Sequence, residues 1–137
     1  MADPEESAAT PGGGRSLLLI EDDPNVGETL AELLGLEGFC VRLAHDAEIG
    51  LSLARRQAPD LVLCDLKLRG RMDGLAFARA CRADPSLNRL RIVAVSGYCR
   101  PEDRARALAA GFDGLVGKPV ELAEIHAVLS APRGAAA

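Results

Sequence analysis

The sequence has few aromatic residues, no excess of basic charge and no long apolar segment, and each absence excludes a class of protein. Aromatic residues make up 3% of the chain, and Trp is absent. Proteins that bind single-stranded nucleic acids stack bases on aromatic rings, and an acidic surface repels a phosphate backbone. Because the net charge is −4, we expect no direct contact with nucleic acid.

Hydrophobicity along the chain argues against a membrane protein. No apolar run is longer than residues 17–20, far short of the roughly 20 residues that a bilayer span requires. Residues 1–6 contain acids and no basic side chain, whereas a secretory signal begins with basic residues. We therefore expect a cytoplasmic protein without membrane contact. Its 137 residues, 48% of them apolar, suffice for one domain with a core of Leu, Val, Ile and Ala.

The cysteines and histidines follow no metal-binding or redox pattern. The cysteines form no CxxC pair and no cluster with histidine; they are Cys40, Cys64, Cys81 and Cys99. We expect reduced thiols, most of them buried as small apolar side chains. His45 and His126 lie away from the ends of the predicted strands, and we expect surface or packing roles for both.

Short apolar runs alternate with segments of helical period, between a predicted disordered tail over 1–15 and another over 132–137. The runs predict strands over 17–20, 39–43, 60–65, 91–95 and 114–117. Helices are predicted from Pro24 to a stop at Gly38, after an Asp46 cap, and over 74–81, 101–110 and 121–130. Strands that are apolar on both faces and joined by helices indicate a parallel α/β sheet covered on both sides.

The first predicted helix illustrates this pattern. Pro24 suits its first turn, and Asp23 is expected to cap its N-terminus. Apolar residues recur at helical spacing along it and are expected to form a stripe that faces the core: Val26, Leu30, Leu33 and Leu34.

Polar residues follow four of the predicted strands. In an open parallel sheet, ligands bind beyond the carboxyl ends of the strands, so these side chains should converge at one edge of the sheet. They are Glu21, Asp22 and Asp23 after the first strand, Asp65 at the end of the third, Ser96 after the fourth and Lys118 after the fifth.

Clustered carboxylates repel one another unless a cation lies among them. Mg²⁺ is a natural solution, because it prefers oxygen ligands and is commonly held by one or two carboxylates together with a phosphoryl group. Of the 16 basic Lys and Arg residues, only Lys67 and Lys118 are lysines, and both are expected near the acids. A lysine can reach one phosphoryl oxygen as a compact point charge.

Five short motifs, in this order, resemble those of a known family, the receiver domains of two-component response regulators. They are Leu18-Leu-Ile-Glu-Asp-Asp-Pro24, Leu61-Val-Leu-Cys-Asp65, Met72-Asp-Gly74, Val95-Ser-Gly97 and Gly117-Lys-Pro119. The resemblance covers residues 17–131, and we place the receiver domain at 16–131. The chain is similar to the chemotaxis response regulators, and its Ser-Gly-Tyr loop resembles receivers attached to hybrid kinases.

The resemblance implies a flavodoxin-like fold, with a five-stranded parallel sheet in the order 2-1-3-4-5 and five helices on its two faces. It implies that Asp65 accepts a phosphoryl group. It also implies that Mg²⁺ is held by Asp22, by Asp65, by the backbone carbonyl of Lys67, and by Glu21 through water.

The same resemblance assigns the remaining roles. Lys118 would neutralise charge on the transferring group, and Ser96 would hydrogen-bond the new phosphoryl oxygen and so change the surface around the fourth and fifth strands. The implied donor is a histidine kinase or a histidine phosphotransfer protein, and an unknown downstream protein would read the changed surface. The resemblance also allows a phosphorylation-dependent dimer, and it implies a signalling domain rather than an enzyme.

The sequence departs from the family pattern at several positions. The family commonly has an aromatic residue three positions before the lysine, and Leu115 occupies that position here. The loop after Asp65 is one residue longer than the common form and carries Arg69 where proline is frequent. We hypothesise that Lys67 and Tyr98 together set the lifetime of the phosphoryl group.

Two other functions stay open. A phosphorylation-independent interaction module would keep the fold without the chemistry, although such forms usually lose the acids or the lysine. An Mg²⁺-dependent phosphatase of the haloacid dehalogenase type would carry Asp-x-Asp at the strand end, whereas this chain has Asp65-Leu-Lys67. The sequence also leaves open whether the domain acts alone, serves in a phosphorelay or is a part of a longer protein.

Overall fold

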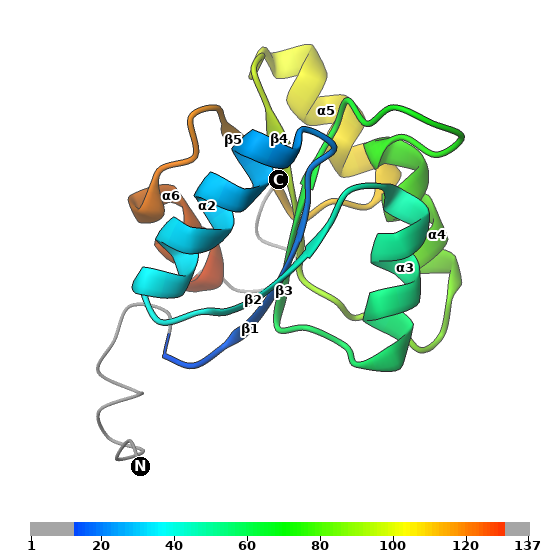
Figure 1. The fold of residues 1–137 in the computed structure, drawn as a ribbon. Helices are drawn as coiled ribbons and strands as arrows, with labels where there is room; N and C mark the ends of the chain where they lie inside the picture. Colours follow the sequence, from blue (N-terminus) through cyan, green and yellow to red (C-terminus); the bar gives the residue numbers. More distant parts are fainter. Residues whose placement is uncertain (1–12, 131–137) are drawn as a thin grey trace.

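The computed structural model describes residues 13–130, which form a parallel sheet between two layers of helices (Figure 1). The strands are β1 (Ser16–Ile20), β2 (Cys40–Ala44), β3 (Leu61–Asp65), β4 (Ile92–Ser96) and β5 (Gly114–Gly117). The helices are α2 (Pro24–Leu36), α3 (Ala47–Arg56), α4 (Gly74–Ala83), α5 (Pro101–Ala110) and α6 (Leu122–Ser130). The strand order is β2-β1-β3-β4-β5, with parallel pairing throughout, so the predicted fold is confirmed.

Both faces of the sheet are apolar because successive strand residues point to opposite sides. Leu18 and Ile20 face the layer of α3, α4 and α5, where they pack with the buried ring of Phe77. Leu17 and Leu19 face the other layer, formed by α2 and α6, and share a cluster with Leu34 and other apolar residues. The central strands therefore exclude water on both sides, which fixes the positions of the residues that follow them.

Local signals set the helix ends as the sequence predicts. Asp23 caps α2 by accepting hydrogen bonds from the backbone N–H groups of Asn25 and Val26. Asp46 caps α3 in the same way. Gly111 ends α5 in the left-handed conformation, with a φ of 118°, which an L side chain rarely adopts.

Two expectations about burial are wrong. Val26 and Leu33 are 45% and 52% exposed, because α2 turns a narrower face to the sheet than its apolar stripe predicts. Cys64 and Cys81 are buried, but Cys40 lies on the edge strand β2 and Cys99 in a surface loop, and both are exposed.

The described chain joins the domain body at its first residues. Gly14 N–H donates to the carbonyl of Gly38, and Cys40 N–H donates to that of Arg15. Residues 1–12 and 131–137, which hold most of the two predicted tails, lie outside the described range. Within that range, every helix is too short or too polar to cross a bilayer.

Candidate functional site

The candidate site lies at the carboxyl ends of β1, β3, β4 and β5. Glu21 follows β1, Asp65 ends β3 and Ser96 ends β4, and these are the buried polar side chains of the part of the chain that the structure describes. Because β1, β3 and β4 are neighbours in the sheet, their carboxyl ends meet at one edge. Lys118 directly follows β5 and reaches across the same edge.

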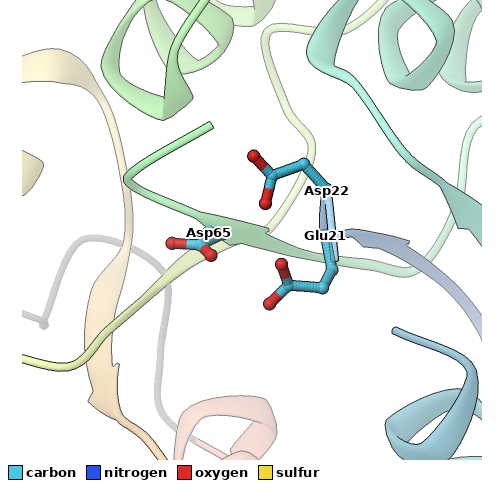
Figure 2. A group of neighbouring side chains, drawn as sticks. All are labelled: Glu21, Asp22 and Asp65. Atoms are coloured by element: carbon cyan, nitrogen blue, oxygen red, sulfur yellow. The ribbon is translucent and has the colours of Figure 1, made fainter. Parts of the chain in front are cut away.

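Three carboxylates gather at this edge. One oxygen from each of Glu21, Asp22 and Asp65 lies within 4.8 Å of the others. Figure 2 shows the side chains of Glu21 and Asp22, from the segment after β1, beside that of Asp65 at the end of β3. Hard oxygen donors in partly buried surroundings suit Mg²⁺, so the residues present fit the predicted ion.

Lys118 supplies positive charge to two of these acids. Its Nζ lies 2.7 Å from Asp65 Oδ2 and 3.3 Å from Glu21 Oε1. Burial disfavours the ammonium, but the hydrogen bond and the charge of Asp65, together with Glu21, outweigh it and raise the pKa of Lys118. The lysine is therefore a stable cation. Its backbone N–H donates to the carbonyl of Ser96, which connects the ends of β4 and β5.

The charged form of Glu21 is less stable at this edge than in water, so the pKa of its carboxyl group is raised. Burial raises its pKa, a hydrogen bond from the N–H of Asp23 opposes the rise, and the charge of Asp65 adds to it. Lys118 again opposes the rise without cancelling it. Further positive charge among these acids would be favourable, which is what a divalent cation supplies.

Asp65 is held from two sides. Its Oδ1 accepts a hydrogen bond from the N–H of Lys67, at 3.0 Å, and its Oδ2 accepts the bond from Lys118. Gly74 allows the following loop to approach closely: a Cβ at that position would lie 2.4 Å from the Asp65 carbonyl oxygen and 2.7 Å from Leu66 Cα. The glycine of the Met-Asp-Gly motif is therefore required by the packing of the loop against β3.

Asp22 has a partner that sequence reasoning missed. The backbone N–H of Arg69 donates to Asp22 Oδ2 at 3.0 Å, and Arg69 Nε lies 3.6 Å from the same oxygen. The only signal in the sequence is the unusual loop that carries Arg69. A contact between residues 47 positions apart depends on how that loop folds back, which spacing does not reveal.

Ser96 does not hydrogen-bond Asp65; its hydroxyl accepts a hydrogen bond from the N–H of Tyr98 at 3.1 Å. Tyr98 is 58% exposed, and two cations lie over its ring. Lys67 Nζ is 4.9 Å and Arg100 Cζ is 5.5 Å from the ring centroid. Lys67 and Tyr98, which we predicted to act together, are thus in contact beside Ser96.

The position that is commonly aromatic in the family holds a buried leucine in this chain. Leu115 is buried in the layer of α3, α4 and α5, opposite Ala94 on β4. The expectation that His45 lies away from the strand ends is wrong, because it directly follows β2 and its Nδ1 is 3.1 Å from the Glu21 carbonyl oxygen. Its side chain is exposed and lies outside the acidic cluster, and His126 is half-buried on α6.

Two hollows flank the acidic cluster. One, of about 430 Å³, lies between α2 and the segment after β5; its lining includes Val26 and Leu33 as well as Asp65 and Lys118. The other, of about 610 Å³, lies between the loop after β3 and the start of α5, and Tyr98 borders it. The acids are thus reachable from outside.

Comparison with known proteins identifies the family. The sequence model of the response regulator receiver domain matches residues 17–130. A 14.6 kDa uncharacterised protein of Leptolyngbya boryana is 35% identical over 109 residues, covering 80% of this chain and 82% of that protein. The DNA-binding response regulator MtrA of Mycolicibacterium smegmatis is 35% identical over 111 residues, 81% of this chain but 47% of the regulator.

Solved structures agree. A two-component response regulator of the LuxR family from Aurantimonas sp. SI85-9A1 superimposes with a TM-score of 0.76 at 30% identity, covering 87% of each chain. The chain belongs to the response regulator receiver domain family. Members of this family are signalling domains of phosphorylation-based two-component systems, interact with histidine kinases and typically bind Mg²⁺ at an acidic pocket. The chain spans less than half the length of MtrA.

Proposed function

We propose that this domain is a phosphorylation-dependent switch that accepts a phosphoryl group on Asp65. The observation that carries the proposal is the arrangement around that carboxylate. Lys118 Nζ lies 2.7 Å from Asp65 Oδ2, and the carboxylates of Glu21 and Asp22 are grouped with it. Phosphoryl transfer depends mainly on positioning and on positive charge, and this edge of the sheet offers both.

In the transfer step, an oxygen of Asp65 attacks the phosphorus of a phosphohistidine on the partner. The P–N bond breaks, its electron pair stays on the imidazole nitrogen, and an acyl phosphate forms. The ammonium of Lys118, which contacts the Asp65 carboxylate before transfer, can then contact the new phosphoryl oxygens. Asp22, Asp65, the Lys67 carbonyl and, through water, Glu21 would hold Mg²⁺, which would supply further positive charge beside the attacked phosphorus.

The readout in this proposal runs through Ser96. Its hydroxyl proton can donate to a phosphoryl oxygen on Asp65, because the hydroxyl oxygen already accepts from Tyr98. A small shift of Ser96 would carry Tyr98 with it and alter the surface at the ends of β4 and β5. A downstream protein or a second phosphorylated copy would recognise that surface. We expect contact with neither nucleic acid nor membrane, a cytoplasmic location and no conventional enzyme activity.

The approach of the phosphodonor is favoured by the hollow beside α2. Exposed Val26 and Leu33 line it next to Asp65 and Lys118, and exposed apolar groups at a reactive site are suited to protein contact. We propose that a histidine kinase or a histidine phosphotransfer protein docks there. We also propose that Lys67 and Tyr98 limit access of water to the phosphorylated Asp65, and that the buried Leu115 takes no part as an aromatic switch.

The two other functions receive less support. In a phosphatase of the haloacid dehalogenase type, a carboxylate two residues after the nucleophile transfers protons. Here Lys67 stands at that place and its ammonium lies over the Tyr98 ring. A phosphorylation-independent module has no need for four converging charged side chains at a partly buried edge.

The proposal is tested by incubating the protein with Mg²⁺ and acetyl phosphate and measuring its intact mass. We expect the wild type to gain one phosphoryl group and Asp65→Asn to gain none. Asp46→Asn is the matched control, because Asp46 follows β2 at the same edge of the sheet but caps α3 outside the acidic cluster. Equal labelling of wild type and Asp65→Asn, or no labelling of wild type, would overturn the proposal.

A further inference from the structure

The loop after β3 places a cation against the candidate metal site. Arg69 binds Asp22 twice: its backbone N–H donates to Oδ2 at 3.0 Å, and its Nε lies 3.6 Å from the same atom. The Arg69 side chain is 90% exposed, whereas that of Asp22 is 15% exposed. The backbone contact is thus part of the loop, and the guanidinium is a solvent-exposed charge at the edge of the acidic cluster.

The other two carboxylates are neutralised differently. Lys118 contacts Glu21 and Asp65 but makes no ion pair with Asp22. Among the residues that the structure describes, Arg69 is the cationic partner of Asp22. Without a metal ion, two side chains therefore neutralise the acidic cluster. The proposed transfer step uses Lys118 but has no role for Arg69.

We propose that Arg69 is a counter-ion that competes with the divalent cation for Asp22. This inference rests on the proposed function, because it takes Asp22 as a metal ligand. A dication that enters the cluster meets the guanidinium next to one of its ligands, and the repulsion between the two lowers the affinity of the site. The Arg69 side chain turns away from Asp22 into solvent as the ion binds. Because Arg69 also lines the larger hollow, metal binding changes the edge of that hollow.

The backbone contact of Arg69 orients the Asp22 carboxylate, and its guanidinium contributes positive charge. Arg69→Ala keeps the backbone N–H that orients Asp22 and removes only the guanidinium. Exposed ion pairs contribute modestly, so we expect Mg²⁺ to bind Arg69→Ala about two- to fivefold more tightly than wild type. Arg69→Lys keeps a charge near Asp22 and should stay close to wild type.

Salt provides a readout that a structural role would not alter. The Arg69 side chain is exposed, and dissolved ions screen exposed charges within about 10 Å at 0.1 M salt and about 3 Å at 1 M. The ratio of Mg²⁺ affinities between Arg69→Ala and wild type should therefore shrink toward one as NaCl is raised from 0.1 M to about 1 M.

The experiment is calorimetric titration of Mg²⁺ into the unphosphorylated wild type, Arg69→Ala, Arg69→Lys and Arg71→Ala. Arg71 is the matched control, an exposed arginine of the same loop that makes no ion pair with Asp22. We expect tighter binding to Arg69→Ala alone, with the salt dependence given above.

Two results would overturn the inference. If wild type binds Mg²⁺ and Arg69→Ala binds it equally or more weakly, or shows a gain that salt does not reduce, Arg69 is not a competing counter-ion, while the proposed metal site stands. If no variant binds Mg²⁺, the proposed metal site itself is wrong, and the role of Arg69 falls with it.

Discussion

Replacing Lys118 by methionine removes the ammonium group at the centre of the proposed transfer step while keeping most of the length of the side chain. Two contacts disappear, the 2.7 Å contact with Asp65 Oδ2 and the 3.3 Å contact with Glu21 Oε1. The carboxylates keep their places, because the N–H groups of Lys67 and Asp23 still hold them. The variant therefore changes charge more than geometry.

The expected effect follows from the exposure of the lysine. Hydrogen bonds to charged groups contribute roughly 1.5–3 kcal/mol. The Lys118 side chain is 37% exposed and already contacts Asp65 before transfer, so solvent screening and the resting contact both favour the lower figure. A loss of about 1.5 kcal/mol in the transition state corresponds to a rate about tenfold lower.

The assay follows the gain of one phosphoryl group by intact mass over time, with acetyl phosphate and Mg²⁺ in excess. Arg71→Met is the matched control: it removes an exposed cation of the loop after β3 that makes no ion pair with Asp65, and the rate of labelling should stay near that of wild type. Calorimetry should show that Lys118→Met binds Mg²⁺ at least as tightly as wild type, because a competing positive charge is gone. Labelling of Lys118→Met at the wild-type rate would show that the ammonium of Lys118 does not assist the transfer.

Three further predictions concern packing, thiol reactivity and acid. Gly74→Ala forces a Cβ within 2.4 Å of the Asp65 carbonyl oxygen and should cost about 1–3 kcal/mol in urea unfolding, whereas Gly35→Ala, with open space around it, should be neutral or stabilise α2 by up to about 1 kcal/mol. With a thiol reagent, the exposed Cys40 and Cys99 should react fast and the buried Cys64 and Cys81 slowly. Burial raises the pKa of both slow thiols, and it raises that of Cys81 to about 11. Hydrogen bonds from Ser86 and Arg55 lower the pKa of Asp84 below 3.8, so the difference in thermal midpoint between wild type and Asp84→Asn should be present at pH 7 and lost as the pH falls through that lowered value.

Much of the fold could be predicted because strand and helix periods are local. The apolar runs over 60–65 and 91–95 have the length of strands that are buried on both faces, and caps such as Asp23 mark where helices begin. Strand ends were predicted to within one residue, since hydrophobicity does not resolve where the last ladder bond forms. The exposure of Val26 and Leu33 was missed because an apolar stripe does not show how much of it the sheet covers.

Some contacts of the site could be predicted from the sequence and others could not. The topology of a parallel sheet brings residues at strand ends together, so the grouping of Glu21, Asp65 and Lys118 could be expected from sequence. The contact of Arg69 with Asp22 could not, because it depends on the path of an irregular loop. The sheet topology thus predicts which side chains meet at the strand ends, whereas the contact of Arg69 with Asp22 needs the path of the loop.

Chemical trapping identifies the residue that receives the phosphoryl group, which we propose is Asp65. Borohydride reduces an aspartyl phosphate to homoserine, and peptide mapping by mass spectrometry then locates the modified residue. After incubation with Mg²⁺ and acetyl phosphate, we predict homoserine at position 65 and at no other acid of the cluster. Homoserine at position 22, or a phosphorylated protein without modification at position 65, would contradict it.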